Sequence, residues 1–152
     1  SAHSFTLTGF TRGYKQIVVL DEYYKKDRIN PQQLQEAFVD FVRRAQAKYK
    51  VYEAYCDSAE QTLISGLEMA CAQAHVSIDI KNAFYNSMIA QHRWKVMKHC
   101  THIIEAFEQA VYDEKKKNMD VRLDDGLMNV DSLDSTEYST ESVQDDILYI
   151  AA

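Results

Sequence analysis

The sequence predicts an α/β domain in which a mixed sheet of parallel and antiparallel strands is flanked by helices. Two strand-like runs open the chain, and strand and helix patterns alternate after them. The 152 residues suit one domain, and apolar residues make up 46% of them, which is enough to bury a core. We therefore expect one folded unit with one site.

The first two strands are predicted at residues 4–8 and 16–22, because both runs are apolar or β-branched and a turn signal, Thr11-Arg-Gly13, separates them. Pro31 then suits the first turn of a helix. Apolar residues follow it at helical spacing: Leu34, Phe38, Phe41, Val42 and Ala45. The chain is thus expected to open with a hairpin that one helix covers.

A strand at residues 50–56 is predicted to end at Asp57-Ser58, a helix N-cap signal, and the helix after it carries Leu63, Ile64, Leu67 and Ala70. The remaining elements are strands at 76–80 and 93–97 and helices at 83–91, 101–110 and 129–139. The last helix is predicted from the spacing of Val130, Leu133 and Tyr138. The charged stretch 112–125 is expected to be a loop or hairpin.

Charge and cysteine content limit the function classes. A net charge of −6 disfavours long-range attraction to nucleic acid, unless converging carboxylates bind divalent cations that reverse the local field. Three cysteines without a C-x-x-C pair argue against a disulfide framework, and His99-Cys100-x-His102 lacks further ligands for zinc. Without a membrane-length apolar run or a signal peptide, we expect a soluble cytoplasmic protein.

Three acids are the candidate site residues. Asp57 follows a predicted strand, where ligands gather in open α/β sheets, while Asp131 and Asp134 share one face of the last helix. They could hold Mg²⁺ or Mn²⁺ together. Spacing alone favours the simpler alternative, a helix cap and a solvated face. Lys81 and Arg93 are candidate phosphate contacts, and an ordinary solvated role is equally compatible with each.

Several segments resemble, in order, the C-terminal nuclease domain of tailed-phage large terminases, which has an RNase H-like fold. Tyr55-Cys-Asp-Ser-Ala-Glu60 resembles the motif with the family's second acid. Asn129-Val-Asp-Ser-Leu-Asp-Ser-Thr-Glu-Tyr138, after Val121-Arg-Leu-Asp-Asp-Gly126, resembles the late helix with the third. Ser1-Ala-His-Ser-Phe-Thr-Leu-Thr-Gly9 and Val19-Leu-Asp-Glu-Tyr-Tyr24 resemble the second and third strands. The similarity ends near Tyr138, so residues 140–152 form a tail outside it.

This resemblance implies a metal-dependent endonuclease that cuts concatemeric double-stranded viral DNA during packaging in the host cytoplasm. Asp57, Asp131 and Asp134 would be catalytic and would bind two Mg²⁺ or Mn²⁺ ions. Many relatives carry His where this chain has Asp131, which leaves open whether Asp131 or Asp134 is the primary ligand. The first acid is expected on a strand upstream of Ser1.

The implied partners are DNA, the portal protein and the small terminase subunit, whereas a membrane is not expected. The chain has no G-x-x-x-x-G-K-[ST] motif, so the packaging motor is not part of it. Two alternatives stay open. One is another RNase H-like nuclease such as a junction resolvase, and the other is a non-catalytic DNA-binding or docking module.

Overall fold

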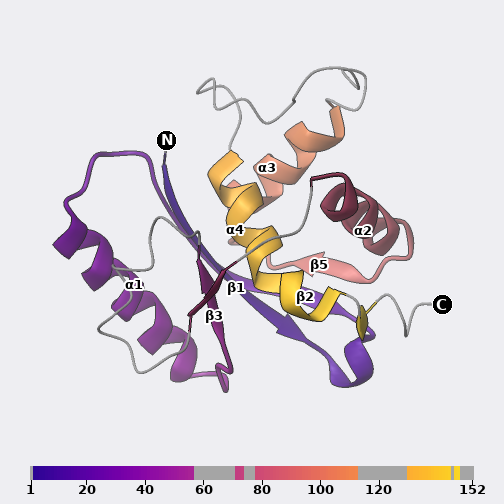
Figure 1. Ribbon diagram of the computed structural model, residues 1–152, viewed down its shortest axis with the longest axis horizontal. Helices are drawn as coiled ribbons and strands as arrows, with labels where there is room; N and C mark the ends of the chain where they lie inside the picture. The colour runs from indigo at the N-terminus through magenta and orange to yellow at the C-terminus, as the bar shows by residue number, and fades with distance from the viewer. Residues whose placement is uncertain (1, 57–70, 74–77, 113–129, 145, 148–152) are drawn as a thin grey trace.

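The computed structural model describes residues 2–56, 71–73, 78–112, 130–144 and 146–147 (Figure 1). These residues form a three-stranded sheet in the order β1-β2-β5 and a two-stranded sheet, β3-β4, with helices packed around them. Strand pairing is antiparallel between β1 and β2 and parallel in the other two pairs. The predicted α/β class with a mixed sheet is therefore confirmed.

The predicted hairpin consists of β1 (His3–Phe10) and β2 (Ile17–Lys25), joined by the short 3-10 helix η1 (Arg12–Tyr14). Gly13 in this turn has φ 70°, a left-handed conformation that glycine adopts without a steric penalty. The backbone N–H of Thr11 donates to the carbonyl of Gln16 at 3.0 Å and closes the turn. The turn signal in the sequence thus marked the correct position.

A β-bulge in β2 decides which side chains share a face of the hairpin. Leu7 pairs with Asp21 and Thr8 pairs with Val19, so Leu20 has no partner on β1. Residues directly opposite in an antiparallel pair share a face. Val19 and Glu22 therefore point to the same side although they are three residues apart, because the bulge reverses the alternation between them.

Helix α1 (Pro31–Gln46) covers one face of the hairpin, as predicted. Asn30 caps it, since its side chain accepts the N–H of Gln33 at 2.8 Å and the side chain of Gln33 accepts the N–H of Asn30. Phe5 of β1 lies against the rings of Phe38 and Phe41, at centroid distances of 5.0 and 5.8 Å. Aromatic packing therefore holds this layer in place.

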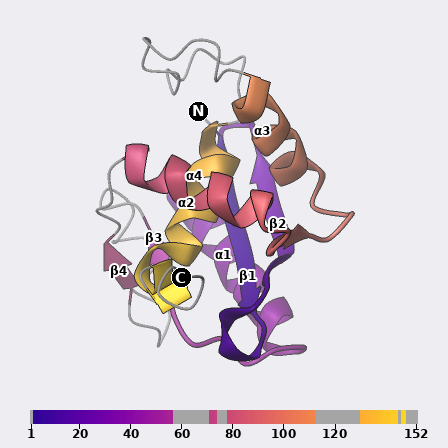
Figure 2. The ribbon, with the colours of Figure 1, turned by 90° about the vertical axis from the view of Figure 1, so that its right-hand side faces the viewer.

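The other face of β2 carries the main core, which is built with α2 (Ile78–Ala90), β5 (Trp94–Val96), α3 (Thr101–Tyr112) and α4 (Val130–Thr140). Figures 1 and 2 show these helices on the side of the sheet opposite to α1. The core residues are apolar and buried: Ile17, Val19, Phe84, Tyr85, Met88, Cys100, Ile103, Ala106, Phe107, Leu133 and Ile147. The positions predicted for β5, α3 and α4 are confirmed to within two residues, whereas α2 begins five residues before the predicted helix at 83–91.

The structure corrects two of the predicted strands. β3 (Ala54–Cys56) is shorter than the predicted strand at 50–56, and its partner is β4 (Cys71–Gln73). The strand expected at 76–80 is wrong, because residues 78–80 form the first turn of α2. Five residues that alternate between apolar and polar fit either structure, and the longer helical stretch that follows decides for a helix. The helix expected after Asp57 and the stretch 113–125 lie outside the described residues.

The C-terminal stretch contributes to the packing beyond the end of α4. A short 3-10 helix, η4 (Glu141–Val143), follows α4 directly. Gln144 is 4% exposed, and Ile147 is completely buried in the core. The segment set apart as a tail from Thr140 onward therefore starts as part of the folded core.

Candidate functional site

Two of the three predicted catalytic acids lie on α4 beside β1. Asp131 and Asp134 are both half-buried, and both line one groove. Oδ2 of Asp131 accepts a hydrogen bond from the backbone N–H of Ala2 at 2.9 Å. The structure thus brings these two carboxylates to one wall of the groove and ties Asp131 to the start of the hairpin.

The third acid, Asp57, lies outside the described residues. It follows Cys56, the last residue of β3, and β3 is one of the elements that α4 contacts. Within the described part of the chain, no three His, Cys, Asp or Glu side chains are grouped so that they could hold a metal ion. Carboxylate oxygens are the donors that Mg²⁺ and Mn²⁺ prefer, so Asp131 and Asp134 suit such a cation chemically. A full ligand set requires further acids, and the prediction assigns Asp57 to this role.

A contact made of hydroxyl groups holds α4 against β1. Alternate residues of β1 point their hydroxyl groups at α4. Oγ1 of Thr6 lies 2.6 Å from Oγ of Ser135, and Oγ1 of Thr8 lies 2.6 Å from Oγ of Ser139. We call this contact the hydroxyl interface, and its members are Ser4, Thr6 and Thr8 of β1 with Ser132, Ser135, Thr136 and Ser139 of α4.

The hydroxyl interface explains how polar residues become buried in α4. Ser132 and Thr136 are completely buried, and Thr136 donates to the carbonyl of Ser132 at 2.8 Å. The hydroxyl group of Tyr85 in α2 donates to the carbonyl of Thr136 at 3.1 Å and also contacts the hydroxyl group of Thr140. Because buried polar groups need partners, these bonds fix the position of α4 along β1. The placement of Asp131 and Asp134 follows from that position.

Apolar residues alone do not describe the inward face of α4. Leu133 is 5% exposed, whereas Tyr138 is half-buried and lines the groove. The inward position of the hydroxyl residues was not predicted, because the helix was predicted from the spacing of apolar residues alone and Ser and Thr are not among them. A signal for them was present, since Ser4, Thr6 and Thr8 alternate along one strand face.

The groove beside Asp131 and Asp134 has a volume of about 1370 Å³. It runs along β1 from Ala2 to Phe10, and residues 48–55, which end in β3, line it as well. The α1 wall is mainly apolar and is formed by Leu34, Phe38, Phe41, Val42 and Ala45. The α4 wall is polar and is formed by Asp131, Asp134, Ser135, Tyr138 and Ser139. The two walls thus differ in chemistry.

The predicted phosphate contacts have different surroundings. Arg93 is half-buried, and its guanidinium donates to the carbonyl of Tyr14 at 2.7 Å and to that of Lys15 at 3.1 Å. These bonds brace the turn between β1 and β2. Lys81 belongs to α2, but its side chain lies outside the described residues. DNA contact by either residue stays a prediction.

A cluster around the end of β2 was not predicted as a unit. The carboxylate of Glu22 accepts the backbone N–H groups of His102 and Ile103 at 2.9 and 2.8 Å, which caps the N-terminus of α3. On the other side of β2, Asp21 pairs with Arg44 of α1 at 2.8 Å and lies 3.6 Å from Nε2 of His99. Both acids are therefore engaged in structural contacts.

Cys100 lies in this cluster and is completely buried. Burial, and secondarily the charges of Glu22 and Asp21, raises the pKa of its thiol to about 12. A thiol with this pKa is protonated at neutral pH and is a poor nucleophile. Cys100 is therefore a core thiol rather than a reactive one.

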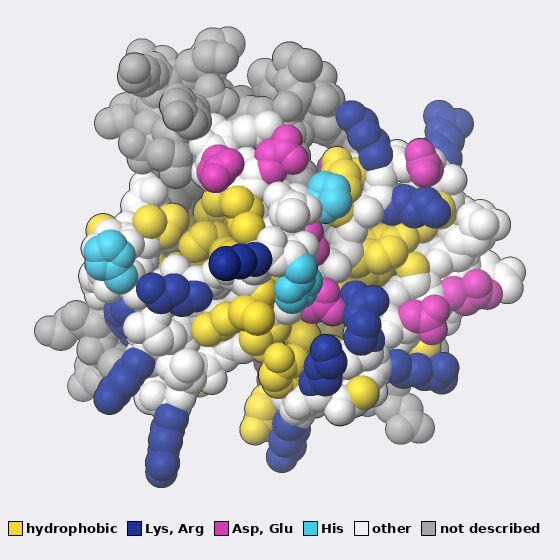
Figure 3. Space-filling view, turned by 180° about the vertical axis from the view of Figure 1, so that it is seen from behind, with side chains coloured by type: hydrophobic (Ala, Val, Ile, Leu, Met, Phe, Trp, Pro, Cys, Tyr) yellow, Lys and Arg dark blue, Asp and Glu magenta, His cyan; other side chains and the backbone are white. Residues whose placement is uncertain are grey.

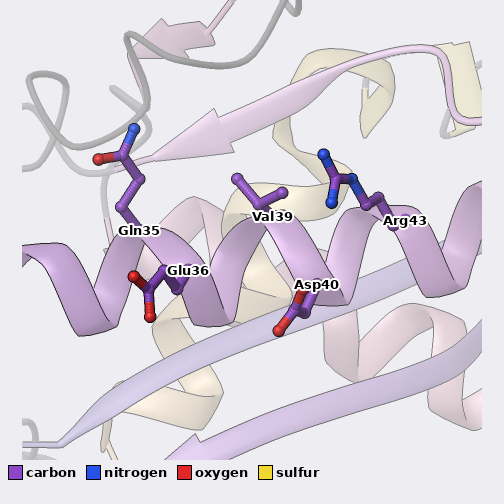
Figure 4. Close-up of a pocket in the computed structure, with 5 residues that line it drawn as sticks. All are labelled: Gln35, Glu36, Val39, Asp40 and Arg43. Carbon is purple, nitrogen blue, oxygen red and sulfur yellow. The ribbon is translucent and has the colours of Figure 1, made fainter.

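Two other surface features are weaker candidates. A hollow of about 460 Å³ lies along α1, where Gln35, Val39 and Arg43 point to one side and Glu36 and Asp40 to the other (Figure 4). A single helix supplies all of these residues, so they do not converge from different elements. Figure 3 shows Lys and Arg side chains scattered over the back face among acidic and apolar ones. Among the described residues, that face therefore presents no continuous basic surface.

Comparisons with known protein families, with characterised proteins and with solved structures found no match to this chain. None of the helices in the described part of the chain is long and apolar enough to cross a membrane.

Proposed function

We propose that this chain is an RNase H-like nuclease domain that hydrolyses phosphodiester bonds of double-stranded DNA with Mg²⁺ or Mn²⁺, as in tailed-phage large terminases. The observation that carries this proposal is the position of Asp131 and Asp134. They lie together on the α4 wall of a groove, on the helix where the terminase resemblance assigns the metal-binding acid.

The fold supports the same proposal. An antiparallel hairpin opens the chain, parallel strand pairs follow, and helices cover both faces of the hairpin. Asp57 comes directly after the last residue of β3, as the resemblance to the family's second-acid motif requires. The element order and the acids are therefore compatible with one site at this groove.

In the proposed mechanism, Asp57, Asp131 and Asp134 would hold the divalent cations. Such ions would supply activation of an attacking water and stabilisation of the leaving 3′ oxygen of DNA. The hydroxyl interface keeps α4 fixed, so the carboxylates of Asp131 and Asp134 need little rearrangement to bind. Because the net charge of the chain is −6, neutralisation by such ions would also favour close approach of the phosphate backbone.

The biological setting belongs to the same proposal. The substrate is concatemeric viral DNA in the host cytoplasm, and the partners are the portal protein and the small terminase subunit. Lys81 and Arg93 are proposed to contact phosphates of the DNA. For Arg93 the contact must coexist with its bonds to the turn at Tyr14 and Lys15.

The direct test is cleavage of supercoiled plasmid by this chain, with a version extended upstream of Ser1 assayed beside it. We expect nicking followed by degradation in Mn²⁺, weaker activity in Mg²⁺ and none in EDTA. The Asp57→Asn and Asp131→Asn variants should be inactive. Asp40→Asn is the matched control, because this exposed acid lies on α1 away from the groove.

The possible outcomes separate the alternatives. Cleavage by the extended version alone would support the proposed site with a further acid upstream of Ser1. A strong preference for branched over linear DNA would favour a junction resolvase. Activity that persists in EDTA would overturn the metal mechanism, and inactivity of both versions would favour a DNA-binding or docking module.

A further inference from the structure

Lysine and tyrosine side chains are interleaved in residues 48–52, which lead from the end of α1 to β3 in the order Lys-Tyr-Lys-Val-Tyr. We call these residues the basic-aromatic segment. All five line the groove. Tyr52 is 79% exposed and Tyr49 is 43% exposed, so neither ring is buried in the core. The segment thus places two solvent-exposed aromatic rings at the groove.

The basic-aromatic segment is short and is anchored to the fold at its start. The carbonyl of Ala45, a buried residue of α1, accepts the backbone N–H groups of Lys48 and Tyr49 at 3.1 and 2.8 Å. Further along, Nζ of Lys50 lies 5.1 Å from the centroid of the Tyr52 ring, which is a cation–π arrangement. A positive charge and an exposed ring therefore lie side by side in the segment.

Charge within the groove is divided between its parts. Among the described residues that line it, the Lys and Arg side chains are Lys48 and Lys50, whereas the carboxylates are Glu53 and the pair Asp131 and Asp134 of α4. A polyanion is repelled by carboxylates that hold no cation and is attracted by ammonium groups. The phosphates of a ligand in this groove are therefore expected along the basic-aromatic segment.

The exposed rings favour a single strand over a duplex. Bases in a duplex are paired and stacked on one another, whereas unpaired bases can stack on aromatic side chains. Lysine and tyrosine at neighbouring positions offer a phosphate contact beside each stacking surface. This combination of a positive groove and aromatic side chains is typical of proteins that bind single strands, and it needs no particular base sequence.

We propose that the basic-aromatic segment binds an unpaired DNA strand, whose bases stack on the two tyrosines and whose phosphates contact the two lysines. Asp131 and Asp134 line the same groove, so the unpaired strand is the one presented to the proposed metal site. The choice of DNA as the nucleic acid rests on the proposed function. The preference for an unpaired strand rests on the residues of the segment.

The test measures binding of a fluorescein-labelled DNA single strand of about 16 nucleotides by fluorescence anisotropy, in EDTA so that the strand is not cut. The duplex and the RNA strand of the same sequence are measured beside it. The tyrosine variants are Tyr49→Ala, Tyr52→Ala and Tyr52→Phe, and the lysine variants are Lys48→Ala and Lys50→Ala. Lys95→Ala is the control, because this exposed lysine lies on β5, at the edge of the sheet opposite to β1.

We expect the parent chain to bind the DNA single strand at least about tenfold more tightly than the duplex. Tyr49→Ala and Tyr52→Ala should each weaken binding at least about fivefold, whereas Tyr52→Phe keeps the ring and should bind like the parent. Each substitution of Lys48 or Lys50 should reduce the slope of log affinity against log salt concentration by about 0.7. The tyrosine variants and Lys95→Ala should leave this slope unchanged.

Several results would overturn the proposal: no binding of the single strand, equal affinity for single strand and duplex, unchanged affinity in both alanine variants of the tyrosines, or tighter binding of RNA. Circular dichroism of each variant checks that the fold is kept, as expected for substitutions of exposed side chains. Strand binding is measured without metal, so its failure is distinguishable from failure of the nuclease proposal, which the plasmid assay reports.

Discussion

Oε1 of Glu22, in strand β2, accepts the backbone N–H of His102 at 2.9 Å and so caps a helix that begins 79 residues later in the chain at Thr101. Oε2 of the same carboxylate accepts the N–H of Ile103 at 2.8 Å, and the side chain of Glu22 is 8% exposed. The bulge at Leu20 makes this contact possible, because it turns Glu22 toward α3. One backbone irregularity thus links the hairpin to the helical layer.

Removal of this cap should destabilise the fold. We expect Glu22→Ala to lower the free energy of unfolding by about 2 kcal/mol, since two helix N–H groups lose a charged acceptor. Glu22→Gln should cost less, because the amide keeps one acceptor oxygen. Urea denaturation followed by circular dichroism measures both variants. Glu105→Ala, at an exposed position of α3, is the control and should change stability by less than about 0.5 kcal/mol.

The hydroxyl interface should behave as a coupled unit. Thr6→Val and Ser135→Ala each remove one member of the 2.6 Å contact between their hydroxyl groups. A double-mutant cycle should give a coupling free energy of about 1 kcal/mol. The pair Ser135→Ala and Thr11→Val, with Thr11 at the exposed turn, should be additive. Additivity in both pairs would contradict an energetic role for this interface.

Arg93 should contribute to stability whatever its role toward DNA. Arg93→Ala removes donors to the carbonyls of Tyr14 and Lys15, and we expect a loss of about 1 to 2 kcal/mol in unfolding free energy. Lys95→Ala, at an exposed position of β5, is the control and should leave stability unchanged. Denaturation curves for both variants check this prediction. If the two variants unfold at the same denaturant concentration, the hydrogen bonds of Arg93 contribute little to the free energy of unfolding.

Cys100 should be unreactive in the folded chain and should make stability depend on alkaline pH. Its thiol pKa is about 12 when folded against a usual 9.0, so the unfolded chain binds fewer protons between these values. Stability from this group is complete below pH 9 and declines as pH rises toward 12, by up to about 1.4 kcal/mol per pH unit. Peptide mapping after iodoacetamide treatment at pH 8 should find Cys100 modified only in denaturant. Rapid labelling of the native chain would contradict its burial.

Asp131 and Asp134 can be distinguished by metal binding. Asp131→Asn keeps an oxygen that can accept the N–H of Ala2, so the fold should persist, but the negative charge is lost. We expect Mn²⁺ affinity, measured by calorimetry, to fall at least about tenfold if Asp131 is the primary ligand. Asp134→Asn should show the larger loss of Mn²⁺ affinity if Asp134 is the primary ligand. Asp40→Asn should bind Mn²⁺ like the parent chain. Unchanged affinity in both groove variants would remove the proposed metal site from α4.

The sequence by itself determined most of the local structure. Periodic apolar residues located the hairpin, α1, α2, α3 and α4, because these patterns reflect burial on one face of each element. Pro31 and Gly13 marked a helix start and a turn through their own backbone preferences. The pair Asp131 and Asp134 was placed on one helix face by spacing alone. Among the described residues, the short strand-like run at 76–80 was assigned to the wrong class, since five residues do not separate the two periods, and the strand predicted at 50–56 is shorter.

The tertiary structure decided which residues of different elements contact one another. The bulge that turns Glu22 toward α3, the hydroxyl contact between Thr6 and Ser135, and the use of Arg93 to brace a turn each join residues far apart in the chain. Such contacts depend on the position of two packed elements, which no local pattern of apolar residues encodes. The groove is of the same kind, because it exists only where β1, β3, α1 and α4 meet.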